Sequence, residues 1–287
     1  MKRITICAMF IALSSFIFAQ TYMSVWKNGV KTDIQISAID SITFGDTETS
    51  NGIGIFSVSP NDKVTFSKGN LQYHPKKKKW QFANNQYDYF GTANENISAD
   101  YNGWIDLFGW GTGNNPTKAN AYSNEYKTFV DWGINQIGED TPNTWRTLTK
   151  AEWEYLLKSR LNAQNLCVVG SIKTDGSSYG EFGLILLPDN WENLDDVKVN
   201  NESYKNTFTV EQWCKLHQAG VVFLPFSGYR YKLGVSSIGD DGYYWSATGV
   251  NNDENASYLR IYSLSTPWKF ETGYRFLGYS VRLVKDL

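Results

Sequence analysis

DGYYWSATG, residues 241–249, sets three aromatic rings beside a serine and two glycines near the end of the chain. Aromatic residues and threonine are favoured in strands, and alternate residues of a strand point to opposite faces. Trp245 therefore lies on one face, and Tyr244 and Ser246 lie on the other. We expect the Trp245 face to pack into the core and the opposite face to carry a binding surface.

Further strand-like segments flank this run, separated by clusters of glycine, asparagine and aspartate. They are VVFLPFSGYRY (221–231), ASYLRIYSL (256–264) and GYSVRLVKD (278–286). In the second of them, Tyr258, Arg260 and Tyr262 share the face opposite Leu259 and Ile261. With two helices upstream, strands and helices do not alternate in a βαβ pattern. The sequence therefore predicts an α+β fold with twisted antiparallel strands and long irregular loops.

The two helices carry clear start signals. In TLTKAEWEYLLKSRL (147–161), Thr149 and Glu152 form a capping box, and apolar residues recur at helical spacing at Trp153, Leu156, Leu157 and Leu161. In TFTVEQWCKLHQAG (207–220), Thr209 and Gln212 repeat the box, and Gly220 provides a C-terminal stop. The expected apolar stripe of this second helix is Val210, Trp213 and Cys214.

The N-terminal region divides into three parts before the main domain, 53–287. Residues 1–19 combine Lys2 and Arg3 with a short apolar run, which predicts a secretory signal peptide and a periplasmic, surface or extracellular location. Residues 20–45 alternate around Asn28-Gly29, a type I′ turn signal, and predict a small β-hairpin with a third short strand. Residues 46–52 are polar and glycine-bearing, as in a linker.

Overall composition limits the function. The chain has 287 residues, of which 41% are hydrophobic and 16% aromatic, and a formal net charge of −2. The small net charge gives no basic surface for binding nucleic acid.

The lysines at 76–79 fit the solvated tip of a hairpin. No second apolar segment follows the signal peptide, so we expect no transmembrane span. Cys167 and Cys214 remain after signal cleavage, and the sequence leaves open whether they pair.

Groups for catalysis are scarce. His74 and His217 are the two histidines, and no metalloprotease, nucleophile-elbow or phosphate-loop motif is present. We therefore expect no enzyme activity and no cofactor. The loops GDDG (239–242) and NNDEN (251–255) offer oxygen ligands for a structural calcium, but turn formation requires the same residue types.

Several blocks of the chain resemble known families. WRTLTKAEWEYLLKSR (145–160) is similar to the helix motif of the formylglycine-generating, sulfatase-modifying family. GVVFLPFSGYR, DGYYWSAT, ASYLRI and GYSVRLV, with GNLQYHPKKKKWQFANNQYDYFG and WIDLFGWGTG, resemble C-type-lectin-fold domains of secreted proteins from anaerobic gut bacteria. These include the Fibrobacter major paralogous domain and the variable proteins of diversity-generating retroelements. The resemblance covers residues 53–287 and implies a C-type-lectin-like fold.

The resemblance does not extend to the chemistry of either family. The reaction of the sulfatase-modifying family resembles a copper-dependent oxidation and uses a pair of cysteines near the C-terminus of those enzymes. The corresponding residues of this chain, 241–287, contain no cysteine. Calcium-dependent lectins hold calcium through an E-P-N or Q-P-D loop and a W-N-D strand. This chain has YWSAT in place of W-N-D and has neither of the loop triplets. Both the copper site and the calcium-dependent sugar site are therefore in doubt.

In the retroelement variable proteins the C-terminal sheet forms the ligand surface. Carried over by matching motif, the exposed ligand-binding candidates are Tyr244, Ser246, Tyr258, Arg260, Tyr262, Trp268, Lys269, Tyr274 and Arg275. Tyrosine, tryptophan and arginine anchor contacts at low entropic cost. The leading hypothesis is a secreted, non-catalytic protein that recognises an extracellular protein or glycan. The alternatives are a divergent sulfatase-modifying-type enzyme and a structural subunit whose N-terminal hairpin augments a neighbour's sheet.

Overall fold

A computed structural model describes residues 22–27, 30–35, 53–119, 122, 125–174, 180–202, 206–250, 254–262 and 267–287. The chain divides into two compact units, residues 1–49 and 50–287. The predicted signal peptide, the third N-terminal strand and the predicted linker lie outside the described residues.

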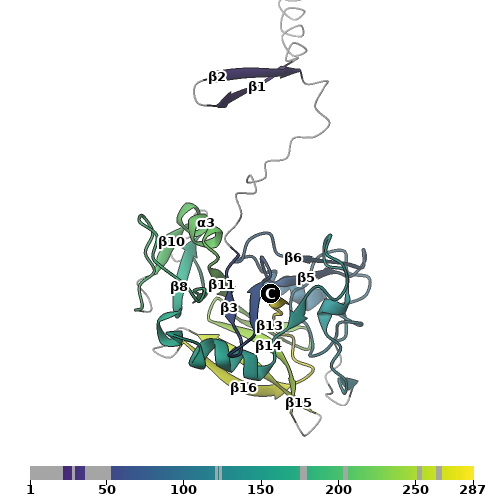
Figure 1. Ribbon diagram of the computed structural model, residues 1–287. Helices are drawn as coiled ribbons and strands as arrows, with labels where there is room; N and C mark the ends of the chain where they lie inside the picture. Colours follow the sequence, from purple (N-terminus) through teal and green to yellow (C-terminus); the bar gives the residue numbers. More distant parts are fainter. Residues whose placement is uncertain are drawn as a thin grey trace, which may run out of the picture. The chain divides into compact units, whose positions relative to one another are not determined.

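The described part of the first unit is one antiparallel hairpin (Figure 1). Strands β1 (Tyr22–Lys27) and β2 (Val30–Gln35) pair in register from Tyr22 opposite Gln35 to Lys27 opposite Val30. This confirms the predicted hairpin, and the register leaves two positions, 28 and 29, for the turn. Ser24 and Asp33, which face each other across the ladder, are hydrogen-bonded and exposed.

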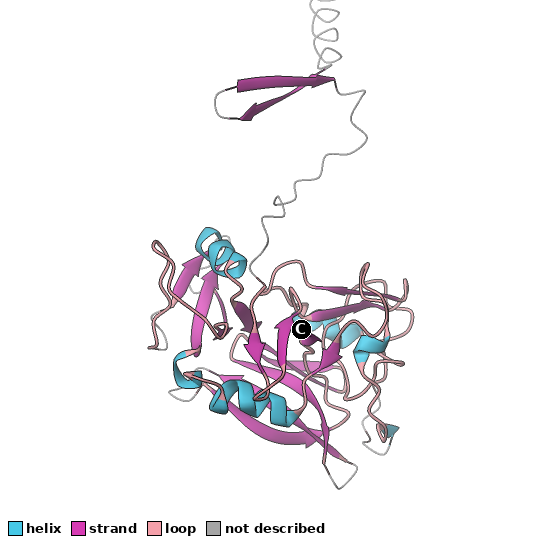
Figure 2. Ribbon diagram, viewed as in Figure 1, coloured by secondary structure: helices cyan, strands magenta, loops and turns pink. Residues whose placement is uncertain are grey.

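The second unit is mostly sheet (Figure 2), which confirms the α+β class. One four-stranded sheet has the order β10-β8-β9-β11, with bounds Thr207–Thr209, Cys167–Lys173, Glu181–Leu186 and Val222–Pro225. A five-stranded sheet has the order β13-β12-β14-β15-β16, with bounds Gly234–Ile238, Ser227–Tyr231, Asp241–Gly249, Asn255–Tyr262 and Trp268–Tyr274. The stretch 241–249 is thus a single strand, β14, inside the larger sheet.

Two smaller sheets complete the unit. The first has the order β3-β4-β17-β7, with bounds Phe56–Ser57, Lys63–Phe66, Leu283–Asp286 and Arg146–Thr147. The second is the hairpin of β5 (Leu71–His74) and β6 (Lys79–Phe82), whose tip exposes the lysines at 76–79 as predicted. Because β17 pairs with β4, the last strand of the chain is joined to the beginning of the unit (Figure 1).

Both predicted helices form behind their capping boxes. Helix α2 (Lys150–Glu154) begins after Thr149, continues as a π-helical turn, η5 (Tyr155–Ser159), and buries Trp153, Leu156 and Leu157. The prediction that Leu161 lies on the same buried stripe is wrong, because the helix has ended and Leu161 is exposed. Within the described ranges, 3₁₀ segments lie at η2 (Gly91–Asn96), η4 (Trp132–Ile134) and η6 (Ala163–Asn165).

Helix α3 (Val210–Gln218) begins after Thr209 and is capped at its C-terminal end by Ala219, with Gly220 directly after the cap. Gly220 has φ of 86°, and the bonds Gly220 N to His217 O and Val221 N to Leu216 O form a Schellman motif, as expected for a glycine stop. Trp213 is buried, but the prediction that Cys214 is on the buried stripe is wrong. Leu216 is buried in its place and Cys214 is exposed.

The core consists of three apolar clusters. The first packs α2 and η5 against β4, β9, β11 and one face of β14 and β15. The second collects the aromatic residues of β5, β6, the 97–137 region and the other face of β14 and β15. The third lies between α3, β8 and β9. Strands β14 and β15 of the five-stranded sheet are therefore covered on both faces, and this arrangement decides which of their side chains reach the surface.

Candidate functional site

Four of the nine predicted binding residues are buried. Tyr244 and Ser246 have no exposed surface, and Tyr258 and Arg275 are almost fully covered. The prediction that these four side chains are exposed is wrong, because apolar clusters cover both faces of the sheet rather than one. The expectation that the Trp245 face is core is confirmed, since Trp245 is buried in the second cluster.

Hydrogen bonds explain the burial of the polar members. Ser246 donates to the carbonyl of Ser257 at 2.7 Å, within the sheet. Arg275 lies over the ring of Trp110 at 4.4 Å and donates to the backbone carbonyls of Tyr126 and Asn255. Trp110, Tyr126 and Lys127 therefore cover Arg275, and its guanidinium holds these residues to the end of β16.

The remaining predicted residues do not share one face. Strand register places Arg260 opposite Tyr243 on one side and Lys269 on the other, so these three lie on the face of the second cluster. Trp268 pairs with Ile261 and packs against the first cluster, with the Lys158 ammonium 5.6 Å from its ring. Trp268 thus belongs to the α2 side of the sheet, away from Arg260 and Lys269.

On the second-cluster face, Arg260 is the centre of a charged network. Its Nη2 lies 2.6 Å from Asp241 Oδ2, and its guanidinium lies about 5.5 Å from the rings of Tyr243 and Tyr262. Burial acts to raise the pKa of Glu271, but hydrogen bonds from Lys269 and Tyr258 outweigh it and hold that pKa below its ordinary value. The network is half-buried and its charged groups are already oriented, so they lose little freedom on binding.

A group of exposed apolar side chains lies at the ends of β12 and β16 and in the turns that follow them. We define the aromatic patch as Tyr231, Leu233, Tyr274 and Phe276. Tyr231 is 48% exposed, Leu233 61% and Tyr274 51%, which makes them three of the nine large hydrophobic side chains that are exposed among the described residues. The Tyr274 and Phe276 rings are stacked at 5.2 Å, and Tyr231 lies 6.0 Å from Phe276. Tyr229, two residues before Tyr231 on β12, contacts Tyr243 of the network face at 5.1 Å.

Sequence reasoning found Tyr274 but missed the other three members of the aromatic patch. The segment SGYRYKLG (227–234) holds a signal for Tyr231, because Tyr229 and Tyr231 alternate around a buried arginine and precede a hairpin turn. Phe276 lies in a turn where no periodicity applies, and only the fold shows that it stacks on Tyr274.

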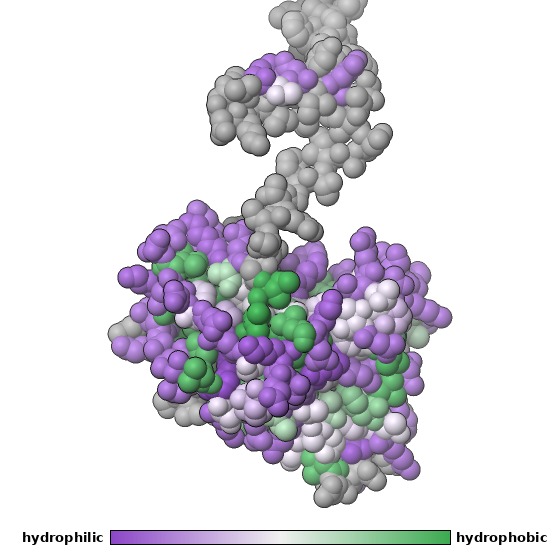
Figure 3. Space-filling view, in the orientation of Figure 1, coloured by the Kyte–Doolittle hydropathy of each residue, from purple (hydrophilic) through white to green (hydrophobic). Residues whose placement is uncertain are grey.

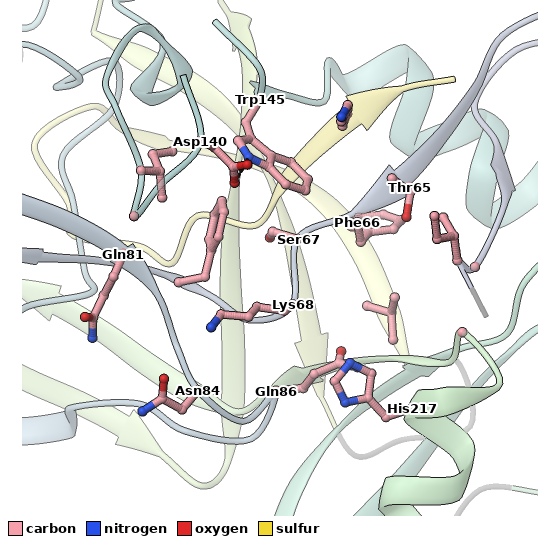
Figure 4. Close-up of a pocket in the computed structure, with 18 of the residues that line it drawn as sticks. Thr65, Phe66, Ser67, Lys68, Gln81, Asn84, Gln86, Asp140, Trp145 and His217 are labelled. Atoms are coloured by element: carbon pink, nitrogen blue, oxygen red, sulfur yellow. Dashed lines mark hydrogen bonds between the residues drawn. The ribbon is translucent and has the colours of Figure 1, made fainter. Parts of the chain in front are cut away.

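A separate cavity of about 700 Å³ lies among β3, β4, β6, β11 and the end of α3, within the size range of small-ligand sites (Figure 4). Trp145 and Asp140 lie on one side and Gln86 and His217 on the opposite side (Figure 4). The floor is apolar and includes Phe66. In the same orientation as Figure 1, hydrophobic residues gather near the middle of the face in view (Figure 3).

Hydrogen bonds hold the walls of this cavity. Trp145 donates from Nε1 to Asp140 at 2.9 Å and contacts Phe82 edge-on at 5.1 Å. Gln86 is buried and donates to the carbonyl of Val221 while accepting from the amide of Phe223. Gln81 and Asn84 line both this cavity and a second one next to it.

A Gly133→Ala substitution is expected to disturb this cavity. A Cβ at position 133 would lie 1.7 Å from the carbonyl oxygen of Trp145, so that backbone must move. We expect a loss of about 1–3 kcal/mol in unfolding free energy and a change in tryptophan fluorescence, both read in one denaturant titration. Gly234→Ala is the control, since its Cβ meets only one atom, at 3.8 Å. Equal stability of the two variants would contradict this packing.

The residues that the structure describes offer few side chains for metal binding or thiol chemistry. No group of three potential metal-ligating side chains comes together there, and Asp241 of the 239–242 loop binds Arg260. Residues 251–253 of the second predicted calcium loop lie outside the described residues. Cys167 and Cys214 are both free thiols. Burial raises the pKa of the Cys167 thiol to about 12.

Of the helices described, none has the length and apolar character to cross a bilayer.

Comparison with protein-family models, curated proteins and solved structures finds no match to this chain.

Proposed function

We propose that this chain is a secreted, non-catalytic binding protein of the C-type-lectin type, and that its aromatic patch and Arg260 network form the contact surface for an extracellular protein. The observation that carries the proposal is the exposure of Tyr231, Leu233 and Tyr274 around the half-buried Phe276. Grouped exposed apolar side chains on a folded domain mark interaction sites.

The chemistry of this surface favours a protein partner over a glycan. Tyrosine, phenylalanine and arginine are the residue types enriched at the centre of protein interfaces. The Tyr274 and Phe276 rings stack on each other, with an interplanar angle of 9°, so each covers part of the face that a sugar ring would use. The hydroxyl groups of the exposed Tyr231 and Tyr274 supply directional contacts. Non-catalytic binding is consistent with a network whose charges are all paired with each other.

A Tyr274→Ser/Phe276→Ser double variant is expected to lose at least 10-fold in affinity for its protein partner. Truncating a central aromatic anchor costs about 2 kcal/mol or more in binding free energy. The measurement uses residues 20–287 against a panel of purified secreted and cell-surface proteins, with a glycan array run in parallel, followed by titration of each ligand found.

Leu161→Ser is the matched control, because Leu161 is also a large exposed hydrophobic side chain but follows η5 on a different element. It should leave the affinity unchanged. A glycan that binds with full dependence on Tyr274 would replace the protein in this proposal. A partner bound equally well by the double variant would contradict the proposed surface.

A further inference from the structure

The second cavity, about 790 Å³ in volume, lies on a different part of the domain from the aromatic patch. Gln72 and Gln81 of the β5–β6 hairpin form one wall, the 84–90 loop another, and Trp104 and Glu181 complete it. We call it the amide pocket. None of its lining residues belongs to the five-stranded sheet.

The amide pocket presents hydrogen-bonding groups that the protein itself leaves unused. Gln72 is only 3% exposed, and its Oε1 accepts from Gln81 Nε2 at 2.8 Å. No hydrogen bond from the Nε2 of Gln72 is present among the described residues, and this atom is not one of the fully buried polar atoms that lack a partner. Because Gln72 lines the cavity, water or a ligand oxygen can accept from this amide.

Other polar side chains line the amide pocket together with Gln72. The carboxamide of Asn84 and the indole N–H of Trp104 form no hydrogen bond within the described part of the chain. Glu181 accepts from Tyr89 at 2.6 Å through Oε2, which leaves its Oε1 uncommitted. The pocket therefore combines amide donors, amide acceptors and a carboxylate acceptor, the set that a ligand with several hydroxyl groups would use.

Aromatic rings line the same pocket. Tyr87, Tyr89, Phe90 and Trp104 all contribute and all are half-buried, so that part of each ring is accessible. Trp104 is held edge-on by His74, with ring centroids 5.1 Å apart. Aromatic faces are apolar surfaces with a negative electrostatic potential, and they pack well against the C–H groups of a pyranose ring.

The charged side chains that line the amide pocket limit the class of ligand that it can bind. The lining includes two carboxylates, Asp88 and Glu181, and none of the residues that line it is lysine, arginine or histidine. An anionic ligand would meet like charge without a compensating cation. A neutral or amine-bearing ligand has no such penalty.

From these contacts we infer that the amide pocket is a carbohydrate site that takes one uncharged or amino pyranose residue of a glycan. Gln72, Gln81, Asn84 and Glu181 bind its hydroxyl groups, and Trp104 stacks on its ring. The 84–90 loop is held in place beforehand, because buried Asp106 accepts from the amide of Phe90 at 2.9 Å and from Asn94 at 2.8 Å.

The test is a titration of the mature chain, followed by tryptophan fluorescence and saturation-transfer NMR. The probes are the methyl pyranosides of glucose, galactose, mannose and N-acetylglucosamine, glucosamine, and their β-linked and α-linked trisaccharides. Sialyllactose is the anionic comparison. We expect one neutral or amino sugar series to bind, and sialyllactose to bind at least 10-fold more weakly.

Variants distinguish a loss of sugar binding at this pocket from an effect of the aromatic patch and from misfolding. Trp104→Ala should abolish sugar binding. Asn84 is exposed and forms no side-chain hydrogen bond with the described residues, so Asn84→Ala should weaken sugar binding at least 5-fold in a fully folded chain. Asn102→Ala, an exposed asparagine outside the pocket, and Tyr274→Ser/Phe276→Ser should both bind sugar normally. Overturning outcomes are no binding by any neutral or amino sugar, a preference for sialyllactose, or equal binding by Asn84→Ala and Asn102→Ala.

Discussion

An Arg282→Met variant is expected to lose about 3 kcal/mol of unfolding free energy, one of the largest effects of any single substitution in this domain. Arg282 is almost fully buried and has no carboxylate partner among the described residues. Its Nε donates to Asn70 Oδ1 at 3.1 Å, its Nη1 donates to the carbonyl of Ser67 at 3.0 Å, and its Nη2 donates to the carbonyl of Phe223.

These three acceptors come from segments far apart in the chain. The 67–70 turn joins β4 to β5, Phe223 is on β11, and Arg282 precedes β17. Burial lowers the pKa of Arg282 to about 10, so the guanidinium still carries its charge at neutral pH. Methionine fills a similar volume but leaves three buried acceptors without donors, and this is the source of the expected loss.

Urea denaturation of wild type, Arg282→Met and Lys285→Met measures the effect. Lys285 is an exposed cation on β17, and its replacement should change stability by no more than about 0.5 kcal/mol. A midpoint for Arg282→Met equal to that of Lys285→Met would mean that the buried arginine does not hold these segments together.

The second large effect is on the pH dependence of stability, and it comes from Asp106. Burial raises the pKa of this carboxyl from its ordinary 3.8 to about 6, despite opposing hydrogen bonds from Asn94 and from the amide of Phe90. The folded state therefore binds the proton more tightly than the unfolded state. Its contribution to stability is fully present below about pH 4 and is lost as the pH rises through about 6.

The comparison that isolates this effect is the difference in unfolding free energy between wild type and Asp106→Asn. That difference should move in favour of the variant by on the order of 3 kcal/mol between pH 4 and pH 7. Other carboxylates with lowered pKa values, such as Asp189 and Glu271, cancel in the difference. A carbon-detected NMR titration of Asp106 with a midpoint below 4 would contradict the prediction.

Local signals predicted the helices well because their causes are local. The capping boxes at Thr149 and Thr209 form within four residues, and Gly220 ends α3 through its own backbone conformation. The error at Leu161 arises where a π-helical turn changes the helical period, and an apolar repeat cannot reveal that change.

Exposure on the C-terminal sheet was not predictable in the same way. Alternation correctly separated Trp245 from Tyr244, but it cannot show whether a second layer covers the other face. Tyr244, Ser246 and Arg275 are covered by segments more than 20 residues away, from α2 to the 110–127 region. The amide pocket has a partial signal, because LQYH and KWQF place Gln72 and Gln81 opposite each other across a predicted hairpin.

We expect partner binding to use the aromatic patch rather than the buried members of the predicted surface. The most direct measurement is the dissociation constant of the protein partner for Tyr274→Ser and for Tyr244→Phe, each in the folded chain. Tyr244 is fully buried and donates to the carbonyl of Pro225, so loss of its hydroxyl should reduce stability but leave affinity unchanged. We predict at least a 10-fold loss for Tyr274→Ser and none for Tyr244→Phe. Unchanged affinity for Tyr274→Ser, or a larger loss for Tyr244→Phe, would contradict the account.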